Sequence, residues 1–574
     1  QTFTTAACAP VATAPGAFGV YEGTVSNSAA ATSTNRVIQT RVAGTAGGLC
    51  SSGGACGLKV AALNNGTINT SFSGTVTASL EACTNVSRSN GVTCGGSWAG
   101  IPGASQAVAL VAGVGTLTFT AVADVYEVVR VKVVSTSPAL TAYGEDYFAI
   151  RPASLVLDAT DGSATTAGTT RALTTGLNSH KASQPFTLRA QALNALGVAT
   201  SRYPGTAPGP VLHNLATLLP TGGVNGALSI GPWSVNGSGN GSPGSLMATA
   251  SYDEAGTFSL SLQDQNFADV DAADTPAAQR VVTGTLAQVG RFTPDHFVTE
   301  LTHACLAGGF TYSGQPFVVK VSAHNAANSI TRNYSGTQAF DHILSVPLVP
   351  GSTGVLTNRS VSAMNFAAGV ATSNSPTYTF SQVTTQPTTI TVRSTDAQGI
   401  TSEGFEGNTQ VRSGRVSMQN AFGSEMLALP LPLRIETYNN GWTIHTADTC
   451  TSLNASNFAW TAGTTSGATS SSNRAWQACD SALSLSGTSP NYQAVISAPG
   501  AAKQGWADVT LLLGNSGSGG ACTSVNGGSG FSRAAVPAMQ PWLQFNWRGS
   551  VGNPSSRVNF GRHNNRMIYM RENF

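Results

Sequence analysis

The stretch SQPFTLRAQALNALGVATSRYPGT (residues 183–206) aligns without a gap with GQPFVVKVSAHNAANSITRNYSGT (residues 314–337). Both copies begin with Gln-Pro-Phe, contain Asn-Ala in the middle and end in Tyr-x-Gly-Thr. Apolar and polar residues alternate before the Asn-Ala pair, and a second short strand is expected after it. We therefore predict two modules of the same β-rich kind, arranged in tandem.

The segments around the two copies also correspond. AIRPASL precedes the first copy and RFTPDHF precedes the second, while GTFSLSLQD and TTITVRSTD follow them as closing strands. Short strands rich in Val, Thr, Ile and Phe recur along the rest of the chain, separated by clusters of Gly, Asn, Ser and Pro. This pattern is typical of β-sandwiches. The predicted fold class is all-β, with tandem immunoglobulin-like β-sandwich modules plus a C-terminal β-domain.

The length of the chain sets the number of domains. At 574 residues it is too long for one core, and roughly 150 residues per domain suggests about four. We predict an N-terminal, Cys-containing β-sandwich module at 1–145 and immunoglobulin-like repeats at 146–287 and 288–400. A C-terminal β-domain, in which aromatic residues concentrate and the repeat signature is lost, is expected at 401–574.

One strand of the predicted C-terminal domain has an unusual composition. In GSEMLALPLPLRIETYNNGW (residues 423–442), apolar residues occupy every second position from Leu427 to Ile435, whereas Pro430 and Pro432 lie on the opposite face. Proline has no N–H donor, so it disfavours pairing with another strand. We predict an edge strand that its prolines protect from intermolecular pairing. The alternative, a strand donated to a neighbouring subunit, is disfavoured by the two missing donors.

Composition limits the partners. Charged residues make up 9% of the chain, against about a quarter in ordinary globular proteins, and the net charge is +2. Without a run of Lys or Arg, no binding to nucleic acid or to an anionic membrane is expected. No apolar stretch reaches the ~18 residues of a membrane-spanning helix, so no transmembrane segment is predicted. A weakly charged, hydroxyl-rich surface and a first residue Gln1 fit an exported, processed polypeptide.

Nine cysteines also favour an oxidising compartment. Their spacing makes Cys50–Cys56, Cys83–Cys94 and Cys450–Cys479 the candidate disulfides. An odd number leaves at least one cysteine free or paired with another chain. None of the spacings is a Cys-x-x-Cys pair, so zinc or redox chemistry is not expected.

The sequence contains no catalytic motif that supports an enzyme. It lacks a phosphate-binding loop, a nucleophile elbow, a dinucleotide fingerprint and a His-Glu-x-x-His pair. Paired carboxylates for glycoside cleavage can lie far apart in sequence, so a secreted carbohydrate-active enzyme is kept as an outranked alternative. We predict no enzymatic activity, no catalytic residues and no cofactor.

Two weak candidate binding sites remain. Asp269, Asp271 and Asp274 crowd within QDQNFADVDAAD and are candidate Ca²⁺ ligands, although a solvated acidic loop is the favoured interpretation. Trp542 in PWLQFNW is a candidate sugar-stacking residue. Strand alternation there would place Trp542, Gln544 and Asn546 on one face, and Leu543, Phe545 and Trp547 on a core face.

Several stretches occur in an order that resembles a known family. They are YFAIRPASL, HKASQPFTLRAQALNALG, GRFTPDHF, FTYSGQPF, GRVSMQNAFGSEMLALPLPLRIETYNNGW, PWLQFNW and VNFGRHNNRMIYMRE. Together they resemble the large C-terminal region of the MshQ-like family of MSHA biogenesis proteins, which are encoded with type IV pilus systems of Gram-negative bacteria. The resemblance runs from about residue 140 to the end. It implies an exported, pilus-associated surface protein without assigned catalytic residues.

The expected function follows from the resemblance and the composition together. The first hypothesis is a pilus-associated adhesin or a tip or assembly component on the surface of a Gram-negative bacterium. The alternative is a structural subunit that assembles into an extracellular filament or sheath. Expected partners are pilus subunits or copies of the chain itself, and surface glycans are a further candidate.

Overall fold

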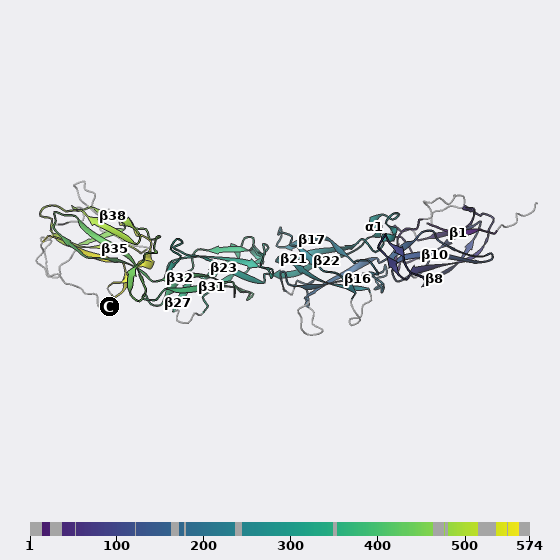
Figure 1. The fold of residues 1–574 in the computed structure, drawn as a ribbon, viewed down its shortest axis with the longest axis horizontal. Helices are drawn as coiled ribbons and strands as arrows, with labels where there is room; N and C mark the ends of the chain where they lie inside the picture. The colour runs from purple at the N-terminus through teal and green to yellow at the C-terminus, as the bar shows by residue number, and fades with distance from the viewer. Residues whose placement is uncertain are drawn as a thin grey trace, which may run out of the picture. The chain divides into compact units, whose positions relative to one another are not determined.

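The computed structural model describes most of the chain, and nearly all of its regular structure is β-strand (Figure 1). It describes residues 14–22, 37–51, 53–54, 56–120, 122–161, 171–176, 179–235, 244–347, 353–462, 476, 480–514, 535–547 and 549–561. The described strands fall into four groups that share no sheet, which we call modules 1 to 3 and the C-terminal domain. The predicted all-β fold class is confirmed.

The described residues of module 1 form twelve strands. They are β1 (Ala17–Glu22), β2 (Arg41–Val42), β3 (Leu58–Asn64), β4 (Thr67–Ile68), β5 (Gly74–Cys83), β6 (Val86–Ser87), β7 (Thr93–Cys94), β8 (Trp98–Leu110), β9 (Val114–Leu117), β10 (Tyr126–Thr136), β11 (Ala139–Tyr143) and β12 (Phe148–Arg151). One main sheet has β1, β3, β4 and β9, and the other has the order β2-β12-β10-β5-β8 with β11 beside β10.

Module 2 also forms two sheets, in the orders β14-β13-β16-β20-β18, with β19 beside β20, and β15-β22-β21-β17. Its elements are β13 (Ser154–Asp161), β14 (Arg171–Ala172), β15 (His180–Lys181), β16 (Phe186–Leu193), β17 (Val211–Leu219), β18 (Leu228–Ile230), β19 (Ser234–Val235), β20 (Ser245–Tyr252), β21 (Gly256–Asp264), η2 (Asp269–Asp271), α1 (Ala277–Arg280) and β22 (Val282–Thr293).

Module 3 forms sheets in the orders β23-β25-β29 and β24-β32-β31-β26-β28, with β27 and β30 as a separate pair. Its elements are β23 (His296–Thr302), β24 (Thr311–Tyr312), β25 (Val318–His324), η3 (Gly336–Gln338), β26 (His342–Ser345), β27 (Gly354–Thr357), β28 (Ser360–Val361), η4 (Ala363–Asn365), β29 (Val370–Ser373), β30 (Thr377–Phe380), β31 (Thr388–Asp396) and β32 (Gly407–Arg412).

The C-terminal domain has one sheet in the order β33-β35-β39-β38, with β36 beside β35, and another in the order β34-β43-β40-β37. Its elements are β33 (Gly414–Met418), β34 (Ala421–Gly423), β35 (Leu429–Tyr438), β36 (Trp442–Ile444), η5 (Ala455–Asn457), β37 (Phe458–Ala462), β38 (Leu483–Thr488), β39 (Asn491–Ile496), β40 (Gly505–Leu511), η8 (Pro541–Leu543), β41 (Phe545–Asn546), β42 (Val551–Gly552) and β43 (Ser555–Phe560).

All four groups share one strand connection. An early short strand pairs in parallel with the last strand of the same group, as in β2–β12, β15–β22, β24–β32 and β34–β43. The other ladders of these sheets are antiparallel, so the chain crosses from one sheet to the other near its start, as in immunoglobulin-like sandwiches. The C-terminal domain has this connection too, although its sequence had not indicated a repeat.

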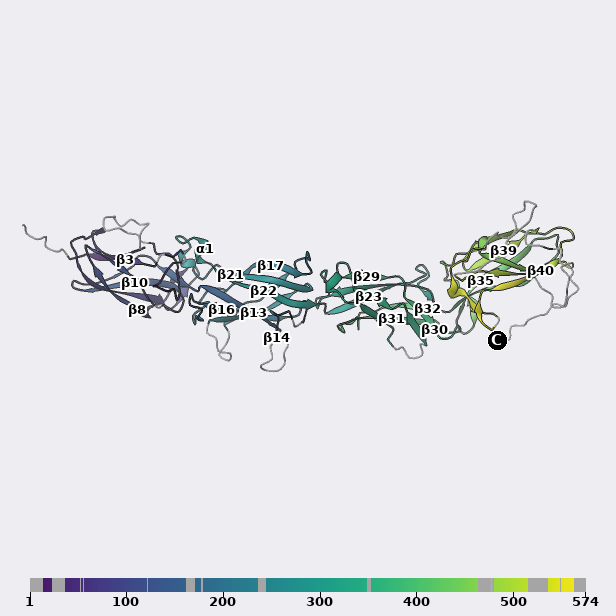
Figure 2. The ribbon, with the colours of Figure 1, turned by 180° about the vertical axis from the view of Figure 1, so that it is seen from behind.

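The predicted module ends at residues 145, 287 and 400 are too early. Each lies before the end of the last strand that pairs within its module. Strands β12, β22 and β32 belong by pairing to the preceding module and end at Arg151, Thr293 and Arg412. By compactness the chain divides into two units, which are seen from behind in Figure 2. Unit 1 comprises Gln1–Asp295 with Asn325–Asn333, and unit 2 comprises His296–His324 with Tyr334–Phe574.

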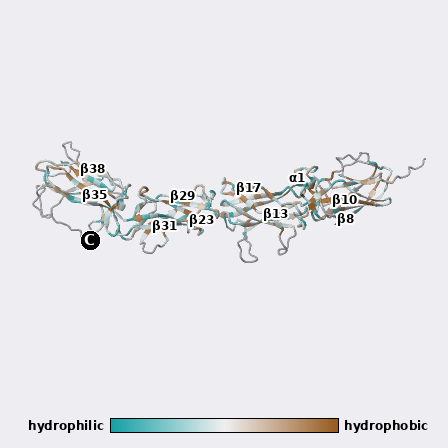
Figure 3. Ribbon diagram, viewed as in Figure 1, coloured by the Kyte–Doolittle hydropathy of each residue, from teal (hydrophilic) through white to brown (hydrophobic). Residues whose placement is uncertain are grey.

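Hydrophobic residues are spread through every module (Figure 3). One continuous buried cluster in unit 1 runs from Phe18 to Phe292, and one in unit 2 runs from Cys305 to Phe560. Two buried tyrosines of the sequence repeat cross-link their sandwiches. The hydroxyl of Tyr203 donates to Asp264 (2.7 Å), and that of Tyr334 donates to Asp396 (3.2 Å). Both aspartates end the closing strand of their module, so the repeated Tyr and Asp form one repeated contact.

The repeated Asn-Ala pairs form docking turns inside unit 1. The Asn194 amide donates to Ala123 O (3.0 Å), and the next residue, Ala195, donates its N–H to Ala43 O (2.8 Å). Both acceptors lie in module 1. In the second copy, Asn325 and Ala326 make the same two bonds, to Asp253 O (2.8 Å) and Ala182 O (3.0 Å).

A carboxylate closes each docking turn. Asp124 accepts the N–H of Ser201 (2.8 Å), and at the corresponding position Glu254 accepts the N–H groups of Arg332 and Asn333 (both 2.9 Å). The repeat that the sequence revealed therefore includes a contact between neighbouring parts of unit 1 as well as a turn.

The position of Pro430 and Pro432 in strand β35 explains why the chain can contain two prolines there. It begins at Leu429, because Leu427 lies in the preceding turn and is 66% exposed, so the predicted start at Leu427 was wrong. Apolar residues from Leu429 to Ile435 are buried and both prolines are exposed. The strand is not an edge strand along its whole length, because β33 pairs with residues 433–437 and β39 with residues 429–434.

The prolines nevertheless lie on an unpaired side of the strand. Ile435 donates its N–H toward the β39 side, to Pro490 O, and Tyr438 donates toward the β33 side, to Ser413 O. Because donors alternate along a strand, even-numbered positions face the β33 side. Within the described residues, no strand pairs with that side at residues 429–432. Pro430 and Pro432 therefore remove donors from a local edge.

Candidate functional site

The candidate site lies in unit 2, where module 3 meets the C-terminal domain. Tyr312 ends β24 and Arg412 ends β32, and these two residues are direct partners in the parallel β24–β32 ladder. His445 directly follows β36, and its N–H donates to Ile435 O in the neighbouring strand (2.9 Å). Strand pairing thus places an aromatic hydroxyl, a guanidinium and an imidazole together.

These side chains form one chain of hydrogen bonds. The Tyr312 hydroxyl donates to Asp448 Oδ2 (2.6 Å) and therefore accepts from His445 Nδ1 (2.8 Å). The other ring nitrogen, His445 Nε2, accepts from a terminal nitrogen of Arg412 (3.0 Å). This bonding pattern assigns a neutral imidazole with its proton on Nδ1.

Burial and charge hold these protonation states. Desolvation first, and then the nearby Arg412 charge, lower the pKa of His445 to about 4. Desolvation and Asp448 raise the pKa of Tyr312 well above its ordinary value. Hydrogen bonds from Thr451 and Tyr312 outweigh burial and lower the pKa of Asp448. The network thus comprises a carboxylate, two neutral rings and a guanidinium at neutral pH.

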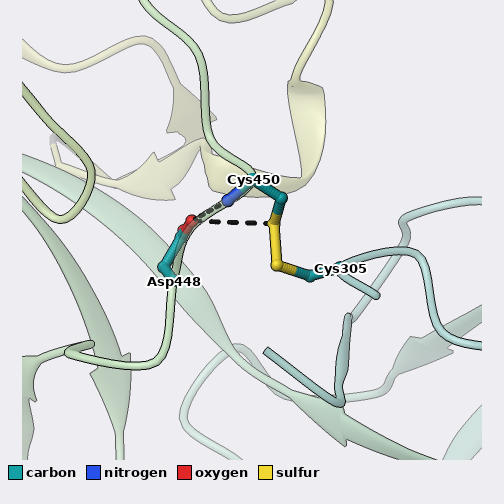
Figure 4. A group of neighbouring side chains, drawn as sticks. All are labelled: Cys305, Asp448 and Cys450. Carbon is teal, nitrogen blue, oxygen red and sulfur yellow. Dashed lines mark hydrogen bonds between the residues drawn. A yellow bond between two sulfur atoms is a disulfide. The ribbon is translucent and has the colours of Figure 1, made fainter. Parts of the chain in front are cut away.

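A disulfide lies beside this network and links module 3 to the C-terminal domain. Cys305 is bonded to Cys450, and Asp448 Oδ1 accepts the N–H of Cys450 (3.0 Å) (Figure 4). The predicted Cys450–Cys479 bridge was therefore wrong; Cys479 lies outside the described residues. The Cys305, Asp448 and Cys450 ligand atoms lie within 4.8 Å of one another, but both sulfurs are in the disulfide and are not thiolate ligands.

The other predicted disulfides are present. Cys50 bonds to Cys56 and Cys83 to Cys94, both in module 1. Cys8 and Cys522 lie outside the described residues. The three disulfides found among the described residues are typical of a protein that folds in an oxidising compartment. Among the described residues, no helix is long and apolar enough to cross a membrane.

The three candidate Ca²⁺ ligands make separate contacts in unit 1. Asp269 pairs with Arg280 (3.1 Å) and approaches Arg88 (3.8 Å), so cations already face it. Asp271 is fully buried, and its Oδ2 accepts the Thr40 hydroxyl (2.5 Å) and the Ala149 N–H (3.0 Å).

Asp274 is half-buried, and its own contact is with the neighbouring Thr275 hydroxyl (3.3 Å). Within the described part of the chain, the three aspartates are not among the groups whose ligand atoms converge. The favoured solvated loop does not describe Asp271 either, because that carboxyl is buried.

Trp542 belongs to the short 3₁₀ helix η8 and not to a strand. The expected alternation of faces was wrong, because only Phe545–Asn546 of this stretch forms a strand. Leu543 is fully buried, and Trp542 is half-buried and packs against the unit 2 core. Sugar stacking by Trp542 stays a prediction.

Three aromatic rings near Trp542 pack around an arginine of the protein. Trp442, Phe545 and Trp547 surround the guanidinium of Arg415 at 4.3, 5.0 and 4.9 Å from the ring centroids. Arg415 also pairs with Glu436 (2.7 Å). The aromatic residues that concentrate in this sequence therefore enclose an ion pair of the protein itself.

Sequence reasoning did not single out Arg412, His445, Tyr312 or Asp448. The resemblance motif FTYSGQPF contained Tyr312 and the module repeat predicted its strand, but the other residues are separated from it by long stretches of chain. The β24–β32 and β35–β36 ladders and the Cys305–Cys450 disulfide bring the four together. Chemically, the group can present one oriented guanidinium to an anion; its hydroxyl and imidazole are occupied by each other.

The chain is a multi-domain protein of immunoglobulin-like β-sandwiches. Docking turns connect neighbouring parts of unit 1, and the Cys305–Cys450 disulfide connects module 3 to the C-terminal domain in unit 2. Residues 254–420 match the family described as DUF6701, third domain, and residues 412–573 match DUF6701, fourth domain. The matched part, residues 254–573, is more than half of the 574-residue chain. A search of curated proteins found no match.

Among solved structures, the chain is similar to surface layer protein SbsC, domains 4-9, at 13% identity and a TM-score of 0.15. That similarity covers 57% of this chain and 40% of the SbsC fragment. It is also similar to the titin domains z1z2 in complex with telethonin, at 9% identity and a TM-score of 0.12, over 46% of this chain and 95% of that one. The fold assignment rests on the strand connections described above.

Proposed function

We propose that the chain is an exported cell-surface protein associated with type IV pili of the MSHA kind, acting as an adhesin or as a tip or assembly component. Ordered motifs that resemble the MshQ-like family support this proposal. So do the three disulfides and the low charge of the chain, which suit a protein outside the cytosol. Its proposed location is the surface of a Gram-negative bacterium.

The observation that carries the proposal is the way neighbouring parts are fastened inside each unit. In unit 1, each docking turn combines two bonds to backbone carbonyls with a carboxylate that accepts backbone N–H groups. In unit 2, the Cys305–Cys450 disulfide joins two domains covalently. An attachment protein carries tension along its chain, and such contacts oppose the separation of domains under load.

The test is to delete the gene in the bacterium that carries it and to measure pili and attachment to surfaces. We expect the deletion to reduce attachment or piliation, and a copy of the gene to restore it. Protease added to intact cells should degrade the protein. Unchanged attachment and piliation, or a protein protected inside intact cells, would contradict the proposal.

A further inference from the structure

A pocket of about 460 Å³ opens beside the hydrogen-bonded network of unit 2. This volume is within the range of ~300–1,000 Å³ that is usual for small-molecule sites, and a junction of domains is a common place for them. The lining includes Gln386, Gln410, Arg412, Thr437, Thr443 and His445. It is largely polar, so it suits a polar ligand better than an apolar one.

The described lining of the pocket carries one positive charge and no carboxylate, because Asp448 lies behind Tyr312 and His445 and is not a lining residue. Arg412 is its one charged lining residue at neutral pH, because His445 is neutral and no Asp or Glu lines the pocket. Among the described residues, Arg412 forms no ion pair. Its contacts are two N–H groups to Gln410 Oε1 (2.9 and 2.7 Å) and one to His445 Nε2 (3.0 Å). A guanidinium has five N–H donors, so two remain for a ligand.

The network fixes the direction of this guanidinium. Gln410 holds one edge of it and His445 holds a terminal nitrogen, while Tyr312 and Asp448 hold the imidazole from behind. Phe310 lies below the guanidinium, with 5.5 Å from the ring centroid to Cζ. An arginine that is already oriented loses little conformational entropy on binding an anion.

Exposed polar side chains complete the pocket. Asn439, Thr443 and Thr446 are exposed lining residues whose side chains make no hydrogen bond to the described residues. Ile444 adds a half-exposed apolar surface. Hydroxyl and amide groups around one arginine match a ligand that carries several hydroxyls and one acidic group.

We propose that this pocket binds a small anionic saccharide, carboxylated or sulfated, with Arg412 as the contact of the acidic group. The inference rests on the proposed adhesive function, because an adhesin needs a ligand on the surface to which it attaches. It adds the class of that ligand and the residues that recognise it.

Calorimetric titration of the purified, oxidised full chain tests the pocket. The probes are glucuronic acid, glucose 6-sulfate and, as the neutral control, methyl glucoside. We expect at least one anionic probe to bind and the neutral sugar to bind at least tenfold more weakly, since a charge-assisted contact is worth roughly that factor. Preference for the carboxylate or for the sulfate identifies the source of the acidic group.

Variants separate the pocket from the rest of the chain. Arg412→Met should abolish binding of the anionic probe, and Thr443→Val, at an exposed position, should weaken it without unfolding the domain. Arg434→Met removes an exposed arginine that does not line the pocket and should bind like the unaltered chain. No binding of either anionic probe, or equal binding by Arg412→Met, would overturn the proposal. Cell attachment is measured separately, so failure of the pocket is distinguishable from failure of the proposed function.

Discussion

At the scale of single residues, the most unusual group is the Asp271 carboxyl of unit 1. It is fully buried, and its Oδ1 has no hydrogen-bond partner among the described residues. Burial, with smaller contributions from Asp274 and Asp146, raises the pKa of Asp271 to about 8. Burial likewise raises the pKa of Asp146 to about 6. Arg41 is buried nearby, where it forms an ion pair with Glu22 (2.5 Å) and also interacts electrostatically with Asp271.

The raised pKa of Asp271 predicts that unit 1 loses stability as pH rises. The unfolded chain releases this proton near pH 4, whereas the folded chain keeps it to about pH 8, so the stabilising effect is complete below pH 4 and lost through pH 8. The Asp271→Asn variant lacks this titrating group, so its stability should not fall in the same way as pH rises. Its free energy of unfolding minus that of the unaltered chain should therefore be about 2–4 kcal/mol larger at pH 8 than at pH 4. Denaturant titration at both pH values measures this difference.

Asp269→Asn is the matched control, because Asp269 is about one-third exposed and pairs with Arg280 and Arg88, whereas Asp271 is buried. It should change stability by less than about 1 kcal/mol at either pH. An equal effect of both substitutions, or an Asp271→Asn effect that does not depend on pH, would show that Asp271 is not protonated in the folded protein.

His342 predicts the opposite pH dependence in unit 2. Desolvation lowers the pKa of this fully buried imidazole to about 4, so as pH falls below ~6.5 the unfolded chain gains a proton that the folded chain refuses. Stability should fall between pH 6.5 and 4 by up to about 3 kcal/mol. His342→Asn should be less stable at pH 7 but less sensitive to acid in the same titration. Equal acid sensitivity in both proteins would contradict the assignment.

At the scale of elements, β35 shows how the chain protects a local edge. Pro430 and Pro432 lie where β35 lacks a partner on its even-numbered side. A strand with free donors at that place can pair with the same strand of another molecule.

Pro430→Val combined with Pro432→Val should restore the two donors and cause self-association, measured by sedimentation velocity. Pro430→Val with Pro432→Lys restores the same donors but adds a charge, and should stay monomeric. A monomeric double-valine variant would show that the prolines have no protective role.

The docking turns predict a second effect at this scale. Glu254 is buried and accepts the N–H groups of Ala255, Arg332 and Asn333. Glu254→Ala leaves these donors unsatisfied, at a cost of about 1–3 kcal/mol. Hydrogen exchange at Arg332 and Asn333 should then accelerate by at least roughly tenfold.

Glu300→Ala is the control for this experiment, because its partner Lys320 is also exposed and the pair stabilises little. Unchanged exchange at Arg332 and Asn333 in the Glu254 variant would mean that the carboxylate does not hold the docking turn.

The sequence predicted the parts of the fold that depend on local pattern. The alternation around Phe186 and Phe317 correctly predicted the strand before each Asn-Ala pair, and the repeated Tyr203 and Tyr334 marked equivalent buried positions. The second strand expected after each pair was wrong, because turns and isolated bridges, and not strands, occupy both segments up to residues 206 and 337. The pairing of β34 with β43 was not predictable, because this parallel ladder joins residues far apart in the chain. Cysteine spacing identified the two short-range disulfides but not Cys305–Cys450, which closes a sequence separation of 145 residues.

The sequence predicted less of the candidate site. By its sequence pattern, Arg412 is an ordinary strand residue. Its place in the candidate site depends on its pairing with Tyr312 in the neighbouring strand and on its hydrogen bond to His445 in the C-terminal domain. The sequence pattern made Asp271 a candidate ligand, but it does not reveal the burial that raises the pKa of this carboxyl.

At the scale of the whole molecule, a covalent bond and docking turns hold neighbouring sandwiches together inside each unit. The loop-entropy model gives the Cys305–Cys450 disulfide about 5 kcal/mol of stabilisation for a separation of 145 residues. Cys305→Ser with Cys450→Ser should therefore lower the unfolding temperature of unit 2 in calorimetry and leave that of unit 1 unchanged. Equal unfolding temperatures in both proteins would show that this disulfide does not support the junction.

Immunogold electron microscopy of intact, piliated cells, with antibodies against this chain, is the direct test of the proposed location. We expect label on the outer surface, as single particles at pilus tips or at the sites where pili emerge. Label repeated regularly along a filament or sheath would instead identify a structural subunit, and the absence of label from the surface of intact cells would contradict an exported attachment protein.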